Sequence, residues 1–217
     1  MTEKIQKLFK NLEKNNITPL YAQNSAEAVK LVKNMLFDGC VITSGGSVSV
    51  AECGIKELIE DKKYNFMNRS KAGITPDEQL ECFKASIGAD FFFCSTNAVT
   101  ENGELVNIDG FSNRISSIAF GPRKVIMIVG INKIVPDLKA AFLRVKKIAA
   151  PKNCVRLGID NPCVKLGHCI SLQNNPDPEF TDGCSKETRI CRNYLISGPQ
   201  KEKGRITVIL VNEALGY

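Results

Sequence analysis

The sequence predicts an α/β protein in which helices flank a mostly parallel sheet, and two features of its 217 residues support this fold class. Short apolar segments with strand character alternate along the chain with segments whose apolar residues recur at helical spacing. One strand segment, 123–131, is apolar almost throughout, which is typical of a strand buried on both faces of a parallel sheet. The length suits a single domain, residues 1–217, that begins with a helix and an extension over 1–23.

The first half of the chain is predicted to form helices that alternate with short strands. Ile5, Leu8 and Leu12 lie on the apolar stripe of a first helix. Asn24 begins a second helix as its N-cap, because a glutamate follows three residues later. The predicted elements are a helix at 3–15, an extended segment at 17–22, a helix at 25–38, a strand at 40–44, a helix at 47–61 and a strand at 65–69.

The second half of the chain continues the alternation. Thr75 and Pro76 mark a strong helix start, and Asn102-Gly103 is a dipeptide that favours a hairpin turn. The predicted elements are a helix at 75–88, a strand at 89–99, a short helix at 112–120, the strand at 123–131, a helix from 136 to about 148 and a last strand at 205–213. Residues 151–204 show little helix or strand signal and are predicted to be an irregular, Cys-rich insert within the domain.

Composition and charge exclude several classes of protein. The 29 basic and 23 acidic residues give a net charge of +6, which favours anionic ligands, and the charges are scattered along the chain. We expect no nucleic acid partner, because aromatic residues are only 7% and no basic stripe stands out. No apolar run is long enough for a membrane span, and the N-terminus is too charged for a secretory signal. The expected location is therefore the cytoplasm.

A loop rich in glycine and serine follows the predicted strand at 40–44 and opens a helix. Ligands of open α/β sheets bind beyond the carboxyl ends of the strands, and amides at a helix N-terminus attract anions. We predict that this loop binds a small anionic or phosphate-bearing ligand through Ser44, Gly45, Gly46, Ser47 and Ser49. The alternative interpretation is a tight turn with a serine cap, since the sequence matches neither the Walker nor the dinucleotide motif.

A polar block between the two central strands supplies the other candidate site residues. Asn113 and Arg114 lie just inside a predicted helix, where a turn does not require them, and Arg114 can clamp a carboxylate or phosphate. Glu101 at a strand end is the candidate nucleophile or base, facing the same pocket. The alternative for Glu101 is ordinary hairpin polarity with a surface ion pair.

These segments resemble the lactate-utilisation (LUD) domain family. The resemblance covers about 38–217, and its most specific parts are 89–110, 133–137, 188–191 and the last ten residues. It implies a fold similar to the NagB/RpiA/CoA-transferase group, and a role in the use of lactate or a related 2-hydroxy acid. It further implies iron–sulfur proteins of a lactate-oxidation complex as partners. The chain has no C-x-x-C-x-x-C run and ends at the domain, so a stand-alone form is expected.

Two rival functions remain open. Residues 100–106, TENGELV, look like the Glu-Asn-Gly stretch of the CoA transferases, so a CoA-transferase-like or sugar-phosphate-isomerase-like enzyme would use Glu101 as its catalytic residue. The second rival is a metal-binding or iron–sulfur partner subunit without catalysis.

The cysteines near the C-terminus are the basis of that second rival. They read Cys154-x8-Cys163-x5-Cys169-x14-Cys184-x6-Cys191. The candidate ligands of a zinc ion or a cluster are Cys163, Cys169, Cys184 and Cys191. The LUD pattern has a similar run with two cysteines closer together, so 170–183 is expected to loop out. Reduced thiols packed under an irregular loop, or a redox disulfide, are the alternatives.

Overall fold

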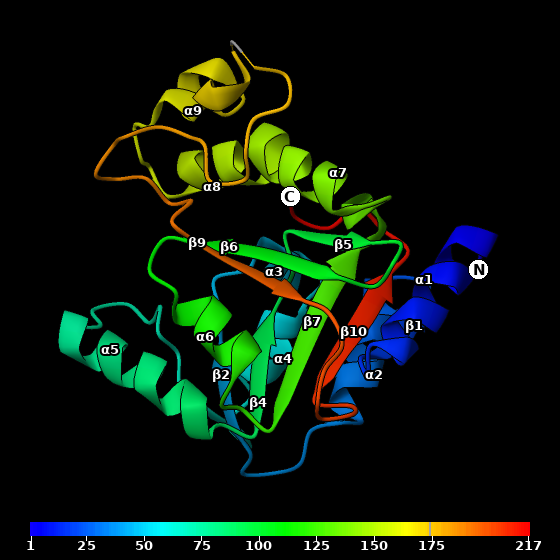
Figure 1. The fold of residues 1–217 in the computed structure, drawn as a ribbon. Helices are drawn as coiled ribbons and strands as arrows, with labels where there is room; N and C mark the ends of the chain where they lie inside the picture. Colours follow the sequence, from blue (N-terminus) through cyan, green and yellow to red (C-terminus); the bar gives the residue numbers. More distant parts are fainter. Residues whose placement is uncertain (174) are drawn as a thin grey trace.

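The computed structural model describes residues 1–173 and 175–217 and contains two sheets, one behind the other in Figure 1. The larger sheet has six strands in the order β1-β10-β7-β4-β2-β3, and all of its pairings are parallel. Its strands are β1 Thr18–Ala22, β2 Val41–Ser44, β3 Asn65–Phe66, β4 Phe91–Cys94, β7 Lys124–Gly130 and β10 Ile206–Val211. The predicted α/β class with a parallel sheet and flanking helices is confirmed.

The central strand β7 is buried on both faces, as its apolar sequence predicts. Val125, Met127 and Val129 pack in one hydrophobic cluster, whereas Ile126 and Ile128 pack in the other, because successive side chains of a strand point to opposite faces. Helices cover both clusters (Figure 1). They are α1 Glu3–Lys14, α2 Ser25–Lys33, α3 Val48–Glu52, α4 Ile55–Ile59 and α6 Asn113–Ala119. A further helix, α5 Pro76–Ala85, has no buried residue and projects away from the sheet.

The smaller sheet has four strands in the order β8-β5-β6-β9. Its strands are β5 Ala98–Thr100, β6 Leu105–Asp109, β8 Ile134–Val135 and β9 Asn193–Ser197. The predicted hairpin at Asn102-Gly103 joins β5 to the antiparallel β6. Gly103 has φ +85°, and a Cβ there would lie 2.9 Å from backbone atoms of Asn11 and Leu12 in α1. Only glycine fits this close approach between the turn and the first helix.

Two predicted helices differ from those observed. The predicted helix at 47–61 is divided into α3 and α4. Gly54 adopts a left-handed backbone conformation, with φ +76°, and interrupts the helix between them. The predicted helix at 136–148 runs further, through α7 Leu138–Arg144, a π-helical turn at Val145–Ala149 and α8 Ala150–Arg156.

The segment 151–204 is more regular than the sequence predicts. It contains most of α8, then α9 Pro162–Leu166, a 3-10 turn at Ile170–Leu172 and the strand β9. β9 pairs with β6 and so belongs to the smaller sheet, while α8 and α9 lie together at the top of Figure 1. Short elements separated by proline and cysteine leave too little periodicity for sequence analysis to detect. Among the described residues, no helix has the length and apolar character that a bilayer crossing requires.

Candidate functional site

Loops from three neighbouring strands meet at one edge of the larger sheet and line a cleft of about 410 Å³. The loops are residues 46–49 after β2, residues 95–97 after β4, and Lys133 after β7. The carboxyl ends of parallel strands share an edge, which is where α/β proteins bind ligands. The opposite wall of the cleft comes from α8 and the last residue, Tyr217, together with residues 187–190.

The two adjacent glycines have different surroundings. A Cβ at Gly45 would lie 3.1 Å from the Cγ and Cδ atoms of Arg114, so this glycine makes room for a protein side chain. Gly46 lines the cleft, and a Cβ there would lie 3.5 Å from Arg69 and 3.8 Å from Arg156. The helix that follows has only five residues and is capped by Ser47, whose side chain accepts the N–H of Val50. Side-chain cations therefore dominate the electrostatics beside this loop.

A buried lysine ties two of the loops together. Nζ of Lys133 donates to Ser49 Oγ at 2.8 Å, to Ser95 Oγ at 3.0 Å and to the carbonyl of Thr96 at 3.3 Å. The Ser49 hydroxyl itself donates to the carbonyl of Leu215 at 3.1 Å, so its proton is already engaged. The predicted role of Ser49 as a donor to a ligand competes with this internal bond.

Lys133 is a positive group without a carboxylate partner. Its side chain is 3% exposed, and it forms no ion pair within residues 1–173 and 175–217. Burial, followed by repulsion from Arg144 and Arg114, lowers the pKa of Lys133 to about 7. The ammonium form is thus costly at this position, and a negative charge in the cleft would stabilise it.

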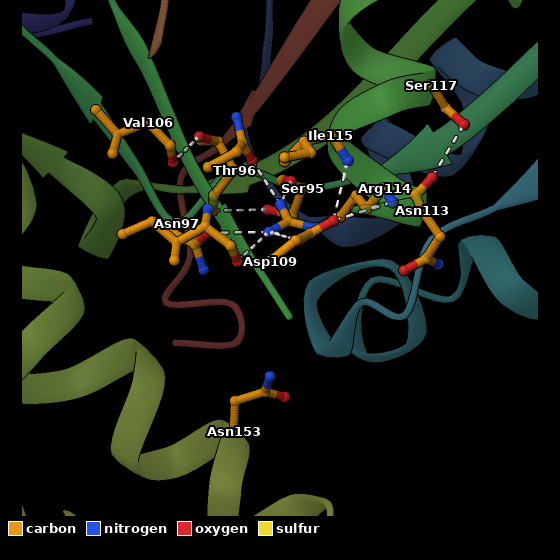
Figure 2. A network of polar contacts seen from close by, with 12 residues as sticks. Ser95, Thr96, Asn97, Val106, Asp109, Asn113, Arg114, Ile115, Ser117 and Asn153 are labelled. Atoms are coloured by element: carbon orange, nitrogen blue, oxygen red, sulfur yellow. Dashed lines mark hydrogen bonds and ion pairs between the residues drawn. The ribbon is translucent and has the colours of Figure 1, made fainter. Parts of the chain in front are cut away.

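Arg114 lies at the centre of a polar network that Figure 2 shows in close-up. Its guanidinium group forms an ion pair with Asp109, with 2.7 Å between Nη2 and Oδ1. Its N–H groups donate to Asp109 Oδ1, Asn97 Oδ1, Asn107 Oδ1 and the carbonyl groups of Ser95 and Ile108. A guanidinium has five N–H donors, so protein acceptors account for all of them. Arg114 lines the cleft, but a ligand would have to displace these bonds to be clamped by it.

Asp109 also holds the start of α6. Its Oδ2 accepts the backbone N–H groups of Arg114 and Ile115, both at 3.0 Å. Ser112, just before the helix, has φ +68°, which is uncommon for a residue other than glycine. The carboxylate therefore replaces the usual side-chain cap and fixes Asn113, which lines the cleft, at the first helical position.

Two arginines on the cleft wall have no carboxylate partner in the described part of the chain. Nε of Arg69 is buried without a hydrogen-bond partner there, and its guanidinium lies 5.0 Å from the ring centre of Phe83. Burial, and then repulsion from Arg156, lowers the pKa of Arg69. Within residues 1–173 and 175–217, Arg156 donates to neutral groups alone, Asn153 Oδ1 and the Tyr217 hydroxyl. The lining of the cleft is therefore net positive, with five cationic side chains against the carboxylates of Asp109 and Glu187.

Glu101 lies outside this cleft. It is at the turn between β5 and β6, where it forms ion pairs with Lys4 at 3.3 Å and Lys7 at 3.2 Å on α1. These lysines, Lys7 first, lower the pKa of Glu101. The expectation that Glu101 faces the same pocket as Arg114 is wrong, because the hairpin turn packs against α1 instead.

The C-terminal cysteines converge on a second, smaller cavity of about 30 Å³. The predicted ligands Cys163, Cys169, Cys184 and Cys191 all line it, and Cys154 does so as well. The Sγ atoms of Cys154 and Cys163 are 3.7 Å apart. Burial, and then repulsion among neighbouring cysteines, raises the pKa of Cys163 and of Cys191 to about 12. Within the described residues, no three His, Cys, Asp or Glu side chains already stand in a metal-binding arrangement.

Comparison with known proteins identifies the family. The sequence model of the LUD domain matches residues 5–211. The chain belongs to the LUD domain family. Among solved structures, it is similar to a DUF162 family protein from Deinococcus radiodurans, with a TM-score of 0.51 and 12% sequence identity over 97% of this chain and 96% of that one. At this identity the likeness shows the fold alone. No curated protein matches the chain.

The family match agrees with the resemblance seen in the sequence. The match begins at residue 5, whereas the resemblance covers the chain from about residue 38 onward. Five of the predicted ligand-binding residues line the cleft, namely Gly46, Ser47, Ser49, Asn113 and Arg114, whereas Ser44 and Gly45 do not. Sequence reasoning missed the three unpaired cations, Arg69, Lys133 and Arg156. Only Lys133 carries a sequence signal, as the first residue of the segment 133–137, which follows a buried strand and carries part of the LUD resemblance.

Proposed function

We propose that the cleft binds a small organic anion, such as the carboxylate of a 2-hydroxy or 2-oxo acid, and that the protein acts in the utilisation of lactate or a related acid. The observation that carries the proposal is the presence of Arg69, Lys133 and Arg156 around one cleft without carboxylate partners in the described residues. The LUD family supplies the metabolic context.

Electrostatics favours this assignment. Partly buried cations that repel one another raise the free energy of the protein, as the lowered pKa of Arg69 indicates. An anion between them would restore the missing hydrogen bonds and remove the repulsion. The cleft volume, about 410 Å³, lies within the range usual for small-molecule sites.

The arrangement of the cations suggests a division of roles. Arg69 lines the cleft with Nη2 beside Gly46, and this atom would donate to a carboxylate or phosphate oxygen. Lys133 donates its three N–H groups to protein acceptors and would act mainly through its charge. Arg114 would act indirectly, because it holds residues 95, 97 and 109 that shape the floor of the cleft.

Calorimetric titration with L-lactate, pyruvate and inorganic phosphate tests the proposal. Arg69→Met and Arg156→Met are expected to weaken binding of the best probe by roughly tenfold or more, since a charge-assisted hydrogen bond contributes about 1.5–3 kcal/mol. Arg123→Met is the matched control, because it removes the same charge from a side chain that is 83% exposed and lies outside the cleft. Absence of binding for all three probes, or an equal loss in the control, would overturn the proposal.

A further inference from the structure

We infer that four of the five C-terminal cysteines, Cys154 among them, bind one tetrahedral, thiolate-bound metal ion of the zinc type. The inference starts from convergence. Cys154 comes from α8, Cys163 from α9, and the other three from the connections that follow, yet all five line the same cavity. The remaining four cysteines of the chain lie elsewhere.

Geometry indicates a single ion. Four sulfur atoms about 2.3 Å from a tetrahedral zinc are separated from one another by about 3.8 Å. The Sγ atoms of Cys154 and Cys163 already stand 3.7 Å apart, which matches one edge of that tetrahedron. The cavity volume of about 30 Å³ suits one water-sized particle, which favours a single ion over a multi-iron cluster.

Hydrogen bonds to sulfur support a thiolate state. The side-chain amide of Asn161 donates to Cys154 Sγ at 3.5 Å, and the Ser171 hydroxyl donates to Cys169 Sγ at 3.3 Å. Such donors to ligand atoms are typical of the groups that surround bound metals. Asn161 is 2% exposed, so its position is fixed by packing.

Nearby cations would balance the charge of the centre. Four thiols that bind one Zn²⁺ each release a proton to solvent and leave a net charge of −2. Lys146, which is 6% exposed, and Arg189 both line the cavity. Arg189 also donates to the carbonyl groups of Cys184 and Cys191, which holds the two late cysteines beside the early ones.

A bound ion would also account for the order of this segment. Short helices and turns between 157 and 192 bury few apolar side chains, so a metal would offset the conformational entropy that their ordering costs. The thiols would turn toward a common centre as the ion enters, because no preformed set of three ligands is present in the described residues. Phe142, which lines the cavity, stacks on Phe180 with 3.6 Å between the ring centres and so covers part of it.

Metal analysis and cobalt substitution of the full chain test this inference. Protein purified anaerobically, or stripped and refilled with Zn²⁺, is expected to hold about one zinc per chain and to shield four thiols from a thiol reagent until a chelator is added. Co²⁺ in place of zinc is expected to give the intense thiolate charge-transfer absorption of a tetrahedral site. Neither readout depends on anion binding, so this test stands apart from that of the proposed function.

Serine variants identify the ligands. Cys154→Ser and Cys163→Ser are expected to lower zinc affinity by tenfold or more, whereas Cys82→Ser, on α5 outside the cavity, is expected to leave it unchanged. Should the cavity variants fail to fold, the cobalt spectrum of the wild-type chain still decides the question. Zinc bound at well under one per chain after refilling, five thiols that react alike, or iron with acid-labile sulfide would each overturn the inference.

Discussion

Arg114 offers the sharpest test of the structural reasoning, because the sequence suggests a ligand clamp and the structure shows a scaffold. Arg114→Met keeps the aliphatic stem on which Gly45 packs and removes the guanidinium. The change leaves Asp109, 8% exposed, without its ion-pair partner, and removes a donor from four other acceptors, of which Asn97 Oδ1 keeps the backbone N–H of Ile108. Breaking a buried pair in this way costs about 3–5 kcal/mol.

The lower end of that range is expected here. Asp109 Oδ2 keeps the two backbone N–H groups of α6, so its charge stays partly compensated. A loss of about 3 kcal/mol is a large share of the roughly 5–15 kcal/mol by which a domain is stable, yet it leaves the chain folded. With an m-value of about 3 kcal/mol/M, the urea midpoint would fall by about 1 M.

Urea unfolding followed by circular dichroism measures this shift, with Arg123→Met as a control that removes an exposed arginine. A double-mutant cycle with Asp109→Asn separates the pair from the other bonds. If Arg114→Met leaves stability within about 0.5 kcal/mol of wild type but abolishes anion binding, then Arg114 contacts the ligand directly and the scaffold argument fails.

Three further predictions follow from single features of the structure. Pyruvate affinity is expected to fall as the pH rises through about 7, because Lys133 has a pKa lowered to about 7 and loses the charge that attracts the anion. Titrations on both sides of that pH measure the change, and Lys133→Met should make the affinity independent of pH in this range. Gly103→Ala is expected to destabilise the fold by about 1–3 kcal/mol more than Gly39→Ala, as measured by urea unfolding. Both glycines have φ near +80°, but only a Cβ at position 103 would meet the backbone of α1. Glu101→Gln is expected to leave the calorimetric binding curve unchanged, because Glu101 contacts α1 and does not line the cleft; a weakened curve would place it in the site after all.

The fold was largely predictable from local signals. Apolar runs identified buried strands, although the single strand predicted at 89–99 is two strands, β4 in the larger sheet and β5 in the smaller one. The capping box at Thr75 is present with both of its hydrogen bonds. The glycine and serine loop was correctly assigned to the connection after β2, because a short apolar run precedes it and a helical pattern follows it. The likeness to the NagB/RpiA/CoA-transferase group stays a prediction.

The cleft was predictable only in part, because its charges come from distant places in the chain. Arg69 follows β3, Lys133 follows β7 and Arg156 ends α8, and of the three only Lys133 lies in a segment, 133–137, that carries the LUD resemblance. Their common feature, the absence of a carboxylate partner in the described residues, exists only after folding. Conversely, the sequence singled out Arg114 as a ligand-binding residue, yet protein acceptors already take the hydrogen bonds of its guanidinium group.

The cysteine cavity and the cleft share a wall, because residues of the C-terminal segment line both of them. Arg189 lines both, and Arg156 in the cleft ends the helix that carries Cys154. Asn161, although absent from the cleft lining, exchanges two hydrogen bonds with Thr188, at 3.0 and 2.8 Å. Whatever fixes the cysteines therefore also fixes the side of the cleft that bears Arg156 and Arg189. If the cleft binds an anion as proposed, the segment would serve that site by positioning positive charge beside it.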